Sequence, residues 1–178
     1  GFDPSVPPRE DGRCVDGVTL HAAAFAAEPI RALAPDLIVC RHVLEHLADP
    51  PGLLRDLRAA CARPGGTPVY FEVPNGRHTL EGPGLWDLIY EHPHYFTAAS
   101  LRRAFADAGF AVEAVEERYG GQFLGVHARA VPSGAGAASR RRSAAGDTPP
   151  VEAAAFAERH RRTVRAWAAR LQDLTAEG

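Results

Sequence analysis

Methionine and lysine are both absent from this chain of 178 residues, and cysteine occurs only three times. Without lysine, arginine carries all of the strongly basic charge, and the arginines are scattered over predicted helix faces, which we interpret as coding bias. Without methionine the chain has no initiator residue, so we expect a fragment of a longer protein. Three cysteines without Cys-x-x-Cys spacing indicate neither a disulfide framework nor a closed zinc site, and they favour a reducing cytosol.

Long apolar runs and a strong excess of charge are also missing. No segment is long and apolar enough to suggest a membrane-spanning helix, and no signal peptide is evident. A net charge of -2 gives no electrostatic reason to expect nucleic acid or an anionic membrane as a partner. The apolar and charged fractions, 46% and 24%, are typical of a globular domain with a real core. We therefore expect a soluble, cytoplasmic protein.

Residues 36–75 form the stretch that is easiest to interpret. Apolar runs of strand length cover 37–40 and 69–73, and between them leucines recur at helical spacing after Asp49. This pattern predicts a strand, a crossover helix and a parallel strand. Ligands of such sheets bind outside the carboxyl ends of the strands, which makes the residues at those ends the first candidates for a site. They are Cys40, Arg41, His42, Pro74 and Asn75.

Two residues upstream fit a nucleotide site, each with a simpler alternative. Asp3 follows an apolar residue and precedes Pro4, where a nucleotide-binding sheet places the acid that binds ribose hydroxyls. The simpler alternative, which the residue taken alone favours, is an aspartate that caps a turn before the proline. Phe25 ends a predicted strand over 18–25, and its ring could either stack on a flat heterocycle or pack in the core.

His42 and His46 are spaced four residues apart, as in some metal-binding helices. The zinc-protease version of this pattern has a glutamate next to the first histidine, whereas Glu45 precedes the second one here. We therefore expect no metal. We interpret His42 as a strand-end residue that lines the crevice and His46 as the start of the following turn. The alternative for both is a capping or surface histidine.

The segment 86–96 is rich in reactive side chains. Two imidazoles, a carboxylate and two phenols lie close together in it: Tyr90, Glu91, His92, His94 and Tyr95. A histidine beside a glutamate is a plausible general base, because imidazole titrates near neutral pH. The alternative is a lid that is packed by its aromatic rings, with the polar groups merely solvated.

The remaining pattern predicts four more elements. Thr97 should cap a helix that ends at Gly109, and strands over 110–115 and 123–130 should pair as an antiparallel hairpin at one edge of the sheet. Residues 131–150 have the composition of a flexible linker. An amphipathic helix should follow over 151–175 and bury its apolar stripe either on the sheet or on a partner outside this chain.

Two groups of motifs resemble one class of enzymes. The first reads Asp36-Leu-Ile-Val-Cys-Arg-His-Val-Leu-Glu-His-Leu-x-Asp-Pro, then Pro64-Gly-Gly and Phe71-Glu-Val-Pro-Asn. It resembles the part of class I S-adenosylmethionine-dependent methyltransferases that follows their Gly-rich cofactor loop. The second reads Tyr90-Glu-His-x-x-Tyr-Phe-Thr-x-x-Ser-Leu, Ala108-Gly-Phe-x-Val and Gly120-Gly-Gln-Phe-Leu. It is similar to C-methyltransferases that act on nucleotide-linked keto-sugars.

The resemblance implies an α/β fold with a Rossmann-like class I methyltransferase sheet. The sheet should be incomplete and mostly parallel, with an antiparallel hairpin at its C-terminal end. Residues 1–130 would be the partial domain, 131–150 a linker, and 151–178 a helix that leads to a missing second domain. The Gly-rich loop would precede Gly1.

The resemblance also implies roles for individual residues. The cofactor would be S-adenosylmethionine, bound by Asp3 at the ribose, by Phe25 beside the adenine, and by Cys40, Arg41 and His42 along the methionine portion. His92 would be the catalytic base, with Glu91 and His46 beside it and with Tyr90 and Tyr95 on the substrate side. Related sugar enzymes carry a tyrosine two residues before this glutamate, where Ile89 stands here. Transfer to oxygen or nitrogen, or nucleotide binding without turnover, are the alternatives.

Overall fold

The computed structural model describes residues 1–61, 65–82, 86–130 and 149–177. The predicted linker therefore lies almost entirely outside the described residues, as does Pro64 of the first motif. Among the described residues, no helix is long and apolar enough to cross a membrane.

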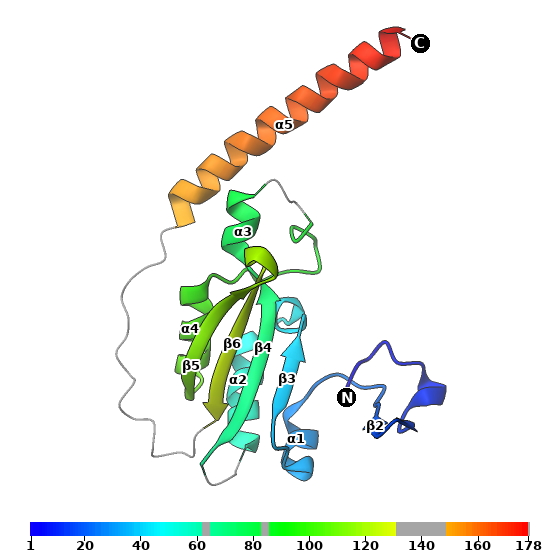
Figure 1. The fold of residues 1–178 in the computed structure, drawn as a ribbon, viewed down its shortest axis with the longest axis vertical. Helices are drawn as coiled ribbons and strands as arrows, with labels where there is room; N and C mark the ends of the chain where they lie inside the picture. The colour runs from blue at the N-terminus through cyan, green and yellow to red at the C-terminus, as the bar shows by residue number, and fades with distance from the viewer. Residues whose placement is uncertain (62–64, 83–85, 131–148, 178) are drawn as a thin grey trace.

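A four-stranded sheet is the centre of the fold (Figure 1). It consists of β3 (Ile38–Arg41), β4 (Thr67–Pro74), β5 (Phe110–Arg118) and β6 (Phe123–Ala130), in the order β3-β4-β6-β5. β3 and β4 are parallel, whereas β4 with β6 and β5 with β6 are antiparallel. The α/β class, the parallel crossover and the edge hairpin are confirmed. The described sheet is mixed rather than mostly parallel, because the hairpin adds its own antiparallel pairing and a second one against β4.

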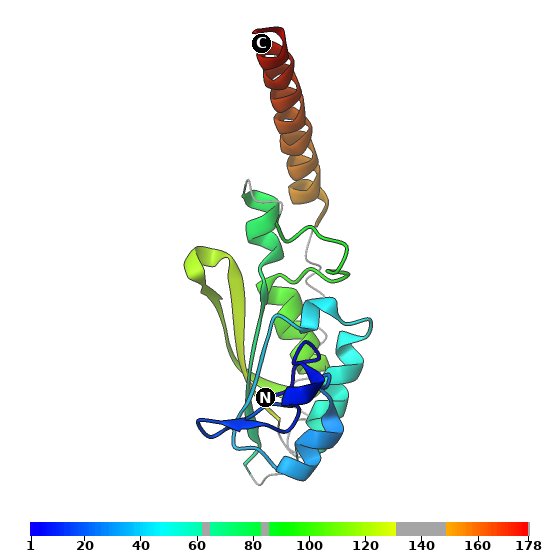
Figure 2. The same ribbon diagram turned by 90° about the vertical axis from the view of Figure 1, so that its right-hand side faces the viewer.

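Helices cover one face of this sheet, as Figure 2 shows. They are α1 (Ala27–Leu33), α2 (Pro50–Ala60) and α4 (Ala98–Asp107). α2 begins where the sequence predicts, because the Asp49 carboxylate accepts a hydrogen bond from the Gly52 N–H at 2.9 Å. Thr97 and Ser100 cap α4 reciprocally in a capping box. No helix covers the opposite face in the described residues, and Val39 of β3 is 54% exposed there.

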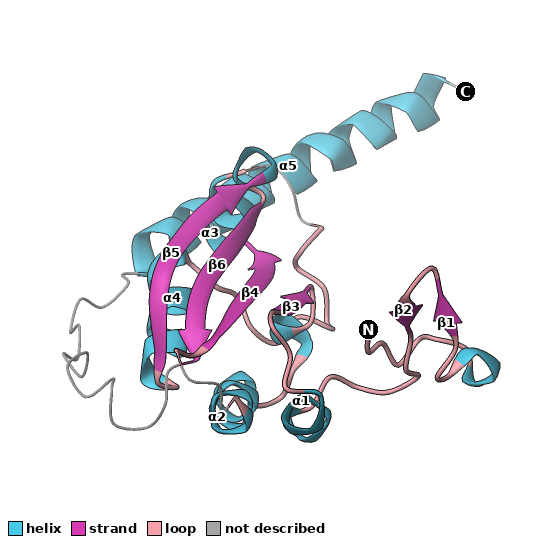
Figure 3. Ribbon diagram, turned by 60° about the horizontal axis from the view of Figure 1, so that its bottom comes forward, coloured by secondary structure: helices cyan, strands magenta, loops and turns pink. Residues whose placement is uncertain are grey.

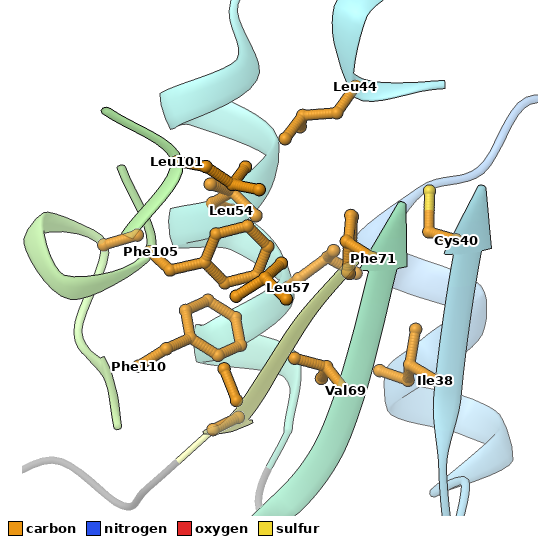
Figure 4. Close-up of a cluster of buried hydrophobic side chains, with 14 of the residues drawn as sticks. Ile38, Cys40, Leu44, Leu54, Leu57, Val69, Phe71, Leu101, Phe105 and Phe110 are labelled. Carbon is orange, nitrogen blue, oxygen red and sulfur yellow. The ribbon is translucent and has the colours of Figure 1, made fainter. Parts of the chain in front are cut away.

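The core lies between the sheet and these helices and is built around aromatic rings in edge-to-face contact (Figure 4). Phe105 of α4 contacts Phe71 of β4 edge to face at 5.1 Å between ring centroids, and Phe110 of β5 at 5.3 Å. Leu54 and Leu57 of α2 complete the layer and are fully buried. Their helical spacing places both leucines on the face that meets the sheet.

The N-terminal segment forms a small separate hairpin, set apart from the four-stranded sheet (Figure 3). β1 (Cys14–Val15) pairs with β2 (Val18–Thr19) across a turn at Asp16 and Gly17, both of which have positive φ. The predicted strand over 18–25 is therefore too long. β2 has only a two-residue partner, and the chain leaves the pairing after the isolated bridge between Phe2 and His21.

The last helix of the chain, α5 (Pro149–Glu177), extends away from the sheet (Figures 1 and 2). It contacts the short helix α3 (Gly76–Glu81), where the Arg159 guanidinium donates to the Leu80 carbonyl. The predicted apolar stripe is largely exposed, with Trp167 63% accessible. The alternative in which this stripe packs against the sheet is thus not the arrangement in the structure.

Candidate functional site

Two segments that are distant in sequence meet beyond the carboxyl ends of β3 and β4. The 3-10 helix η2 (Leu44–His46) follows β3, and residues 86–96 follow β4 and α3. The second segment is attached to the strand end by a parallel bridge between Asn75 and Phe96 and by a 2.8 Å hydrogen bond from the Gly76 N–H to the Phe96 carbonyl. The expectation that these strand ends share one region is therefore correct.

His46 and His92 are brought together there. Their ring centroids are 4.6 Å apart and the rings are tilted by 64°. Nδ1 of His46 lies 2.9 Å from the Glu91 carbonyl oxygen, and Nδ1 of His92 lies 2.9 Å from the Asp87 carbonyl oxygen. A carbonyl can only accept, so Nδ1 is the donor in both rings. In the neutral imidazoles Nε2 consequently keeps its lone pair, which can take a proton or a metal ion.

Glu45 lies in the same cluster and was not among the predicted site residues. Its side chain is 1% exposed, and neither carboxylate oxygen has a hydrogen-bond partner of normal geometry among the described residues. Burial raises the pKa of Glu45, while its own backbone N–H and the nearby His46, His42 and His92 act in the opposite direction. A glutamate next to a motif histidine was visible in the sequence, but the burial of its side chain was not.

A second polar cluster lies at the same strand ends, on the face of the sheet that points away from the core. Nε and Nη2 of Arg41 donate to one oxygen of Glu72 at 2.9 and 2.7 Å, and the Tyr70 hydroxyl donates to the other at 2.7 Å. Nε2 of His42 lies 3.2 Å from Glu72. Burial alone would raise the pKa of Glu72, but the hydrogen bonds from Tyr70 and Arg41 outweigh it and keep that pKa below its usual value.

His42 does not share a helical face with His46. Its φ is +54°, and only a single turn of 3-10 helix follows it, so the four-residue spacing of the two histidines falls across a bend. The His42 ring instead packs edge to face on Phe123 of β6 at 4.8 Å between centroids. Nδ1 of His42 is 3.6 Å from the buried Glu45 carboxylate. The interpretation of His42 as a strand-end residue matches its position, and the helical metal pair is not formed.

The other predicted catalytic and substrate residues lie around the two histidines. Glu91 fixes His46 through its main-chain carbonyl, and its own side chain is exposed. The Tyr90 side chain is 93% exposed, and its hydrogen bond to the Glu91 carboxylate raises the pKa of Tyr90. Tyr95 is 46% exposed. Both phenols are thus accessible to a ligand from solvent.

The predicted cofactor contacts are divided between surface and core. Asp3 is exposed, and its Oδ1 accepts from the N–H and the hydroxyl of Ser5 at 2.8 and 2.7 Å, which lowers the pKa of Asp3. An exposed, ionised carboxylate fits a role as acceptor for ribose hydroxyls. Phe25 packs edge-on against Phe71 at 6.4 Å, and the Cys40 side chain is buried, which raises its pKa to about 12. The Cys40 side chain is core and does not fit a direct cofactor contact, whereas the Phe25 ring is only partly buried and its place beside the adenine stays a prediction.

The fold resembles those of solved methyltransferase structures. An S-adenosylmethionine-dependent methyltransferase from Mesorhizobium loti is 22% identical, with a TM-score of 0.52, over 72% of this chain and 78% of that one. Magnesium protoporphyrin IX methyltransferase from Synechocystis, solved with bound SAH, is 14% identical, with a TM-score of 0.41, over 65% and 53%. A chain of the complex between the Haloferax volcanii Trm112 methyltransferase activator and a methyltransferase is 19% identical, with a TM-score of 0.45, over 55% and 54%.

The chain therefore spans about half the length of two of these three structures. A search of curated protein sequences gave no match. A family model described as "Methyltransferase domain" matches residues 1–115, well over half of the chain. This match confirms, at the level of the family, the methyltransferase domain that the sequence motifs indicate. The chain belongs to the methyltransferase domain family.

Proposed function

We propose that this domain serves a C-methyltransferase that transfers a methyl group from S-adenosylmethionine to a carbon next to a carbonyl. The acceptor would be a small keto-substrate such as a nucleotide-linked sugar, with His92 as the general base. The observation that carries the proposal is the pair of hydrogen bonds from Nδ1 of His46 and of His92 to main-chain carbonyls. They leave an accepting Nε2 in each of two rings whose centroids are 4.6 Å apart at the strand ends.

Methyl transfer to carbon requires few groups from the protein besides a positioned base. S-adenosylmethionine supplies an already activated methyl group when bound. The chain's own residues then have to align the acceptor, exclude water and remove the proton next to the carbonyl. A positioned base contributes about 10²–10⁴-fold to such a step. An oxygen or nitrogen acceptor would depend on that base less.

Each residue of the cluster has a distinct proposed part. His92 takes the proton at Nε2 while the Asp87 carbonyl fixes its ring, and His46 lies beside it with its ring fixed by Glu91. The Glu45 carboxylate would stabilise the imidazolium that forms, since it is buried close to both rings. Tyr90 and Tyr95 are exposed next to them and would contact the acceptor.

We propose fewer residues as contacts of the cofactor than the sequence suggested. Asp3 would bind the ribose hydroxyls, and the main chain at the end of β3 would line the methionine portion. The side chains of Arg41 and His42 would hold the strand end through Glu72 rather than reach the cofactor. The exposed stripe of α5 would pack on a further domain of the whole protein.

Hydrogen exchange at the acceptor carbon separates this proposal from its rivals. The full-length protein is incubated with a nucleotide-linked keto-sugar in D2O, and deuterium uptake next to the carbonyl is followed by mass spectrometry, alongside methylation with S-adenosylmethionine. His92→Gln should lower both rates by about 10²–10⁴-fold. His94→Gln, a matched change two residues away, should leave both unchanged.

Methylation of carbon that persists in His92→Gln would contradict the base, and a product methylated on oxygen or nitrogen would contradict the acceptor class. Calorimetry with S-adenosylmethionine tests the third alternative, a nucleotide-binding domain without turnover. Binding without any methylated product over a panel of keto-substrates would favour that alternative.

A further inference from the structure

We propose that Glu45, His46 and His92 form a binding site for one divalent transition-metal ion, with Zn2+ as the best-matched cation. The sequence argued against a metal because it considered only the pair His42 and His46. The structure separates that pair and supplies a different set of three ligands. The binding site itself does not depend on the proposed reaction.

The first argument is distance. One carboxylate oxygen of Glu45 and one ring nitrogen from each of His46 and His92 all lie within 4.8 Å of one another. Ligand atoms around a tetrahedral zinc ion lie about 2.0–2.2 Å from the metal and therefore about 3.3–3.6 Å from one another. The three ligand atoms would have to approach one another by at most about 1.5 Å to close the site.

The second argument is the orientation of the imidazoles. Metal-bound histidines almost always donate their other ring N–H to a carboxylate or a main-chain carbonyl, which fixes the ring and makes the free nitrogen more basic. His46 and His92 both do this, through the Glu91 and Asp87 carbonyls at 2.9 Å. The second layer of such a site is thus already formed, with Nε2 left as the ligand in each ring.

The third argument is the buried carboxylate. Glu45 is 1% exposed, and both of its oxygens lack hydrogen-bond partners among the described residues, which is costly for a charged group unless a cation compensates it. A protonated His42 would form an ion pair with Glu45, since its Nδ1 lies 3.6 Å from one carboxylate oxygen. The same imidazole, however, also pairs with Glu72 through Nε2 at 3.2 Å. A metal ion would satisfy the Glu45 carboxylate directly.

The ligand set selects the type of cation. Ca2+ and Mg2+ prefer all-oxygen sites, whereas two imidazoles and a carboxylate suit zinc and its neighbours in the first transition row. Three protein ligands also leave a fourth position open. If the proposed function is correct, Zn2+ would occupy the same nitrogen of His92 that acts as the base, and added Zn2+ should inhibit methylation of carbon.

Metal binding can be measured without any turnover. The full-length protein is stripped with a chelator, titrated with ZnCl2 in a calorimeter, and titrated with Co2+ while visible absorption is recorded. The wild type should bind one equivalent more than Glu45→Gln, His46→Gln or His92→Gln. If a variant retains residual binding at this site, its affinity should fall by more than the roughly 10–100-fold that the loss of a second-layer partner costs.

His94→Gln and Glu81→Gln are the matched controls, because these side chains lie outside the cluster, and both should bind as the wild type does. Thermal unfolding in the presence of chelator should show that each variant is folded. Equal zinc stoichiometry and affinity in the wild type and the three folded variants would overturn the metal site, while the deuterium-exchange test of His92 could still succeed. Conversely, a loss of zinc binding in the variants would support the site even if His92→Gln methylates normally.

Discussion

His46 and His92 face each other with ring centroids 4.6 Å apart, although one follows β3 and the other lies beyond α3. The contact is held by main-chain carbonyls rather than by the carboxylates near these histidines in the sequence, since His46 bonds to the carbonyl of Glu91 and His92 to that of Asp87. The bond from His46 therefore holds residues 86–96 against η2, and the two bonds together fix the orientation of both imidazole rings.

His46→Gln should loosen this loop locally. The hydrogen bond from Nδ1 to the Glu91 carbonyl is lost or weakened, at a cost of about 1 kcal/mol, which corresponds to roughly fivefold faster local opening. The His92 amide, bonded to the Ile89 carbonyl at 3.1 Å, should exchange its hydrogen faster by that factor. His78→Gln, in α3, should leave this amide unchanged. Equal exchange in both variants would show that the Glu91 contact does not hold the loop.

Glu72→Gln should flatten the dependence of stability on pH. The pKa of Glu72 is lower in the folded protein than in the unfolded chain, where it is about 4.3, so its charge stabilises the fold above that value. This stabilisation is lost as the pH falls through the folded pKa. The variant should also lose roughly 1–3 kcal/mol at neutral pH, because its bonds to Tyr70 and Arg41 are no longer charge-assisted. Urea unfolding from pH 7 down to the acid limit measures both effects.

The control for Glu72 is Glu113→Gln, which removes an exposed ion pair with Arg129 at 3.2 Å. Surface pairs of this kind contribute about 0–1 kcal/mol. If both variants showed the same pH profile as the wild type, the cluster around Glu72 would not contribute to stability.

Phe105→Ala should destabilise the domain by about 3–5 kcal/mol. The ring is fully buried and contacts Phe71 and Phe110 edge to face, so its removal leaves a cavity between α4 and the sheet. Tyr90→Ala removes an aromatic ring that is 93% exposed and should change the free energy of unfolding by no more than about 0.5 kcal/mol. Chemical denaturation of both variants measures the difference in the free energy of unfolding. Similar losses of stability in the two variants would contradict the place of Phe105 at the centre of the core.

The three thiols should differ sharply in reactivity. Burial raises the pKa of Cys40 to about 12 and also raises that of Cys61, whereas Cys14 is exposed. At pH 8, alkylation of the folded protein followed by peptide mass spectrometry should modify Cys14 and spare the other two, because the thiolate is the reactive form. Unfolding in denaturant should expose all three. Rapid labelling of Cys40 in the native state would contradict its place in the core.

Local signals in the sequence determined much of the fold. Asp49 before two prolines, Thr97 before a leucine-rich stretch, and the glycines between the last two strands each specify a boundary through short-range hydrogen bonding or backbone geometry, and each lies where it was expected. The motifs around Glu45 and Phe71 were enough to identify the enzyme family. The strand predicted over 18–25 was too long because its length depended on a pairing partner, and pairing is not a local property.

The site depended on tertiary structure. The sequence suggested His46 and His92 as active-site residues, but long-range contacts such as the bridge between Asn75 and Phe96 place their segments side by side. It suggested the side chain of Cys40 as a cofactor contact, whereas packing turns this thiol into the core. It passed over Glu45 and Glu72, because a sequence lists a carboxylate but does not show its burial or its partners. Burial and long-range hydrogen bonding decide the chemistry of these groups, and both arise only when the chain folds.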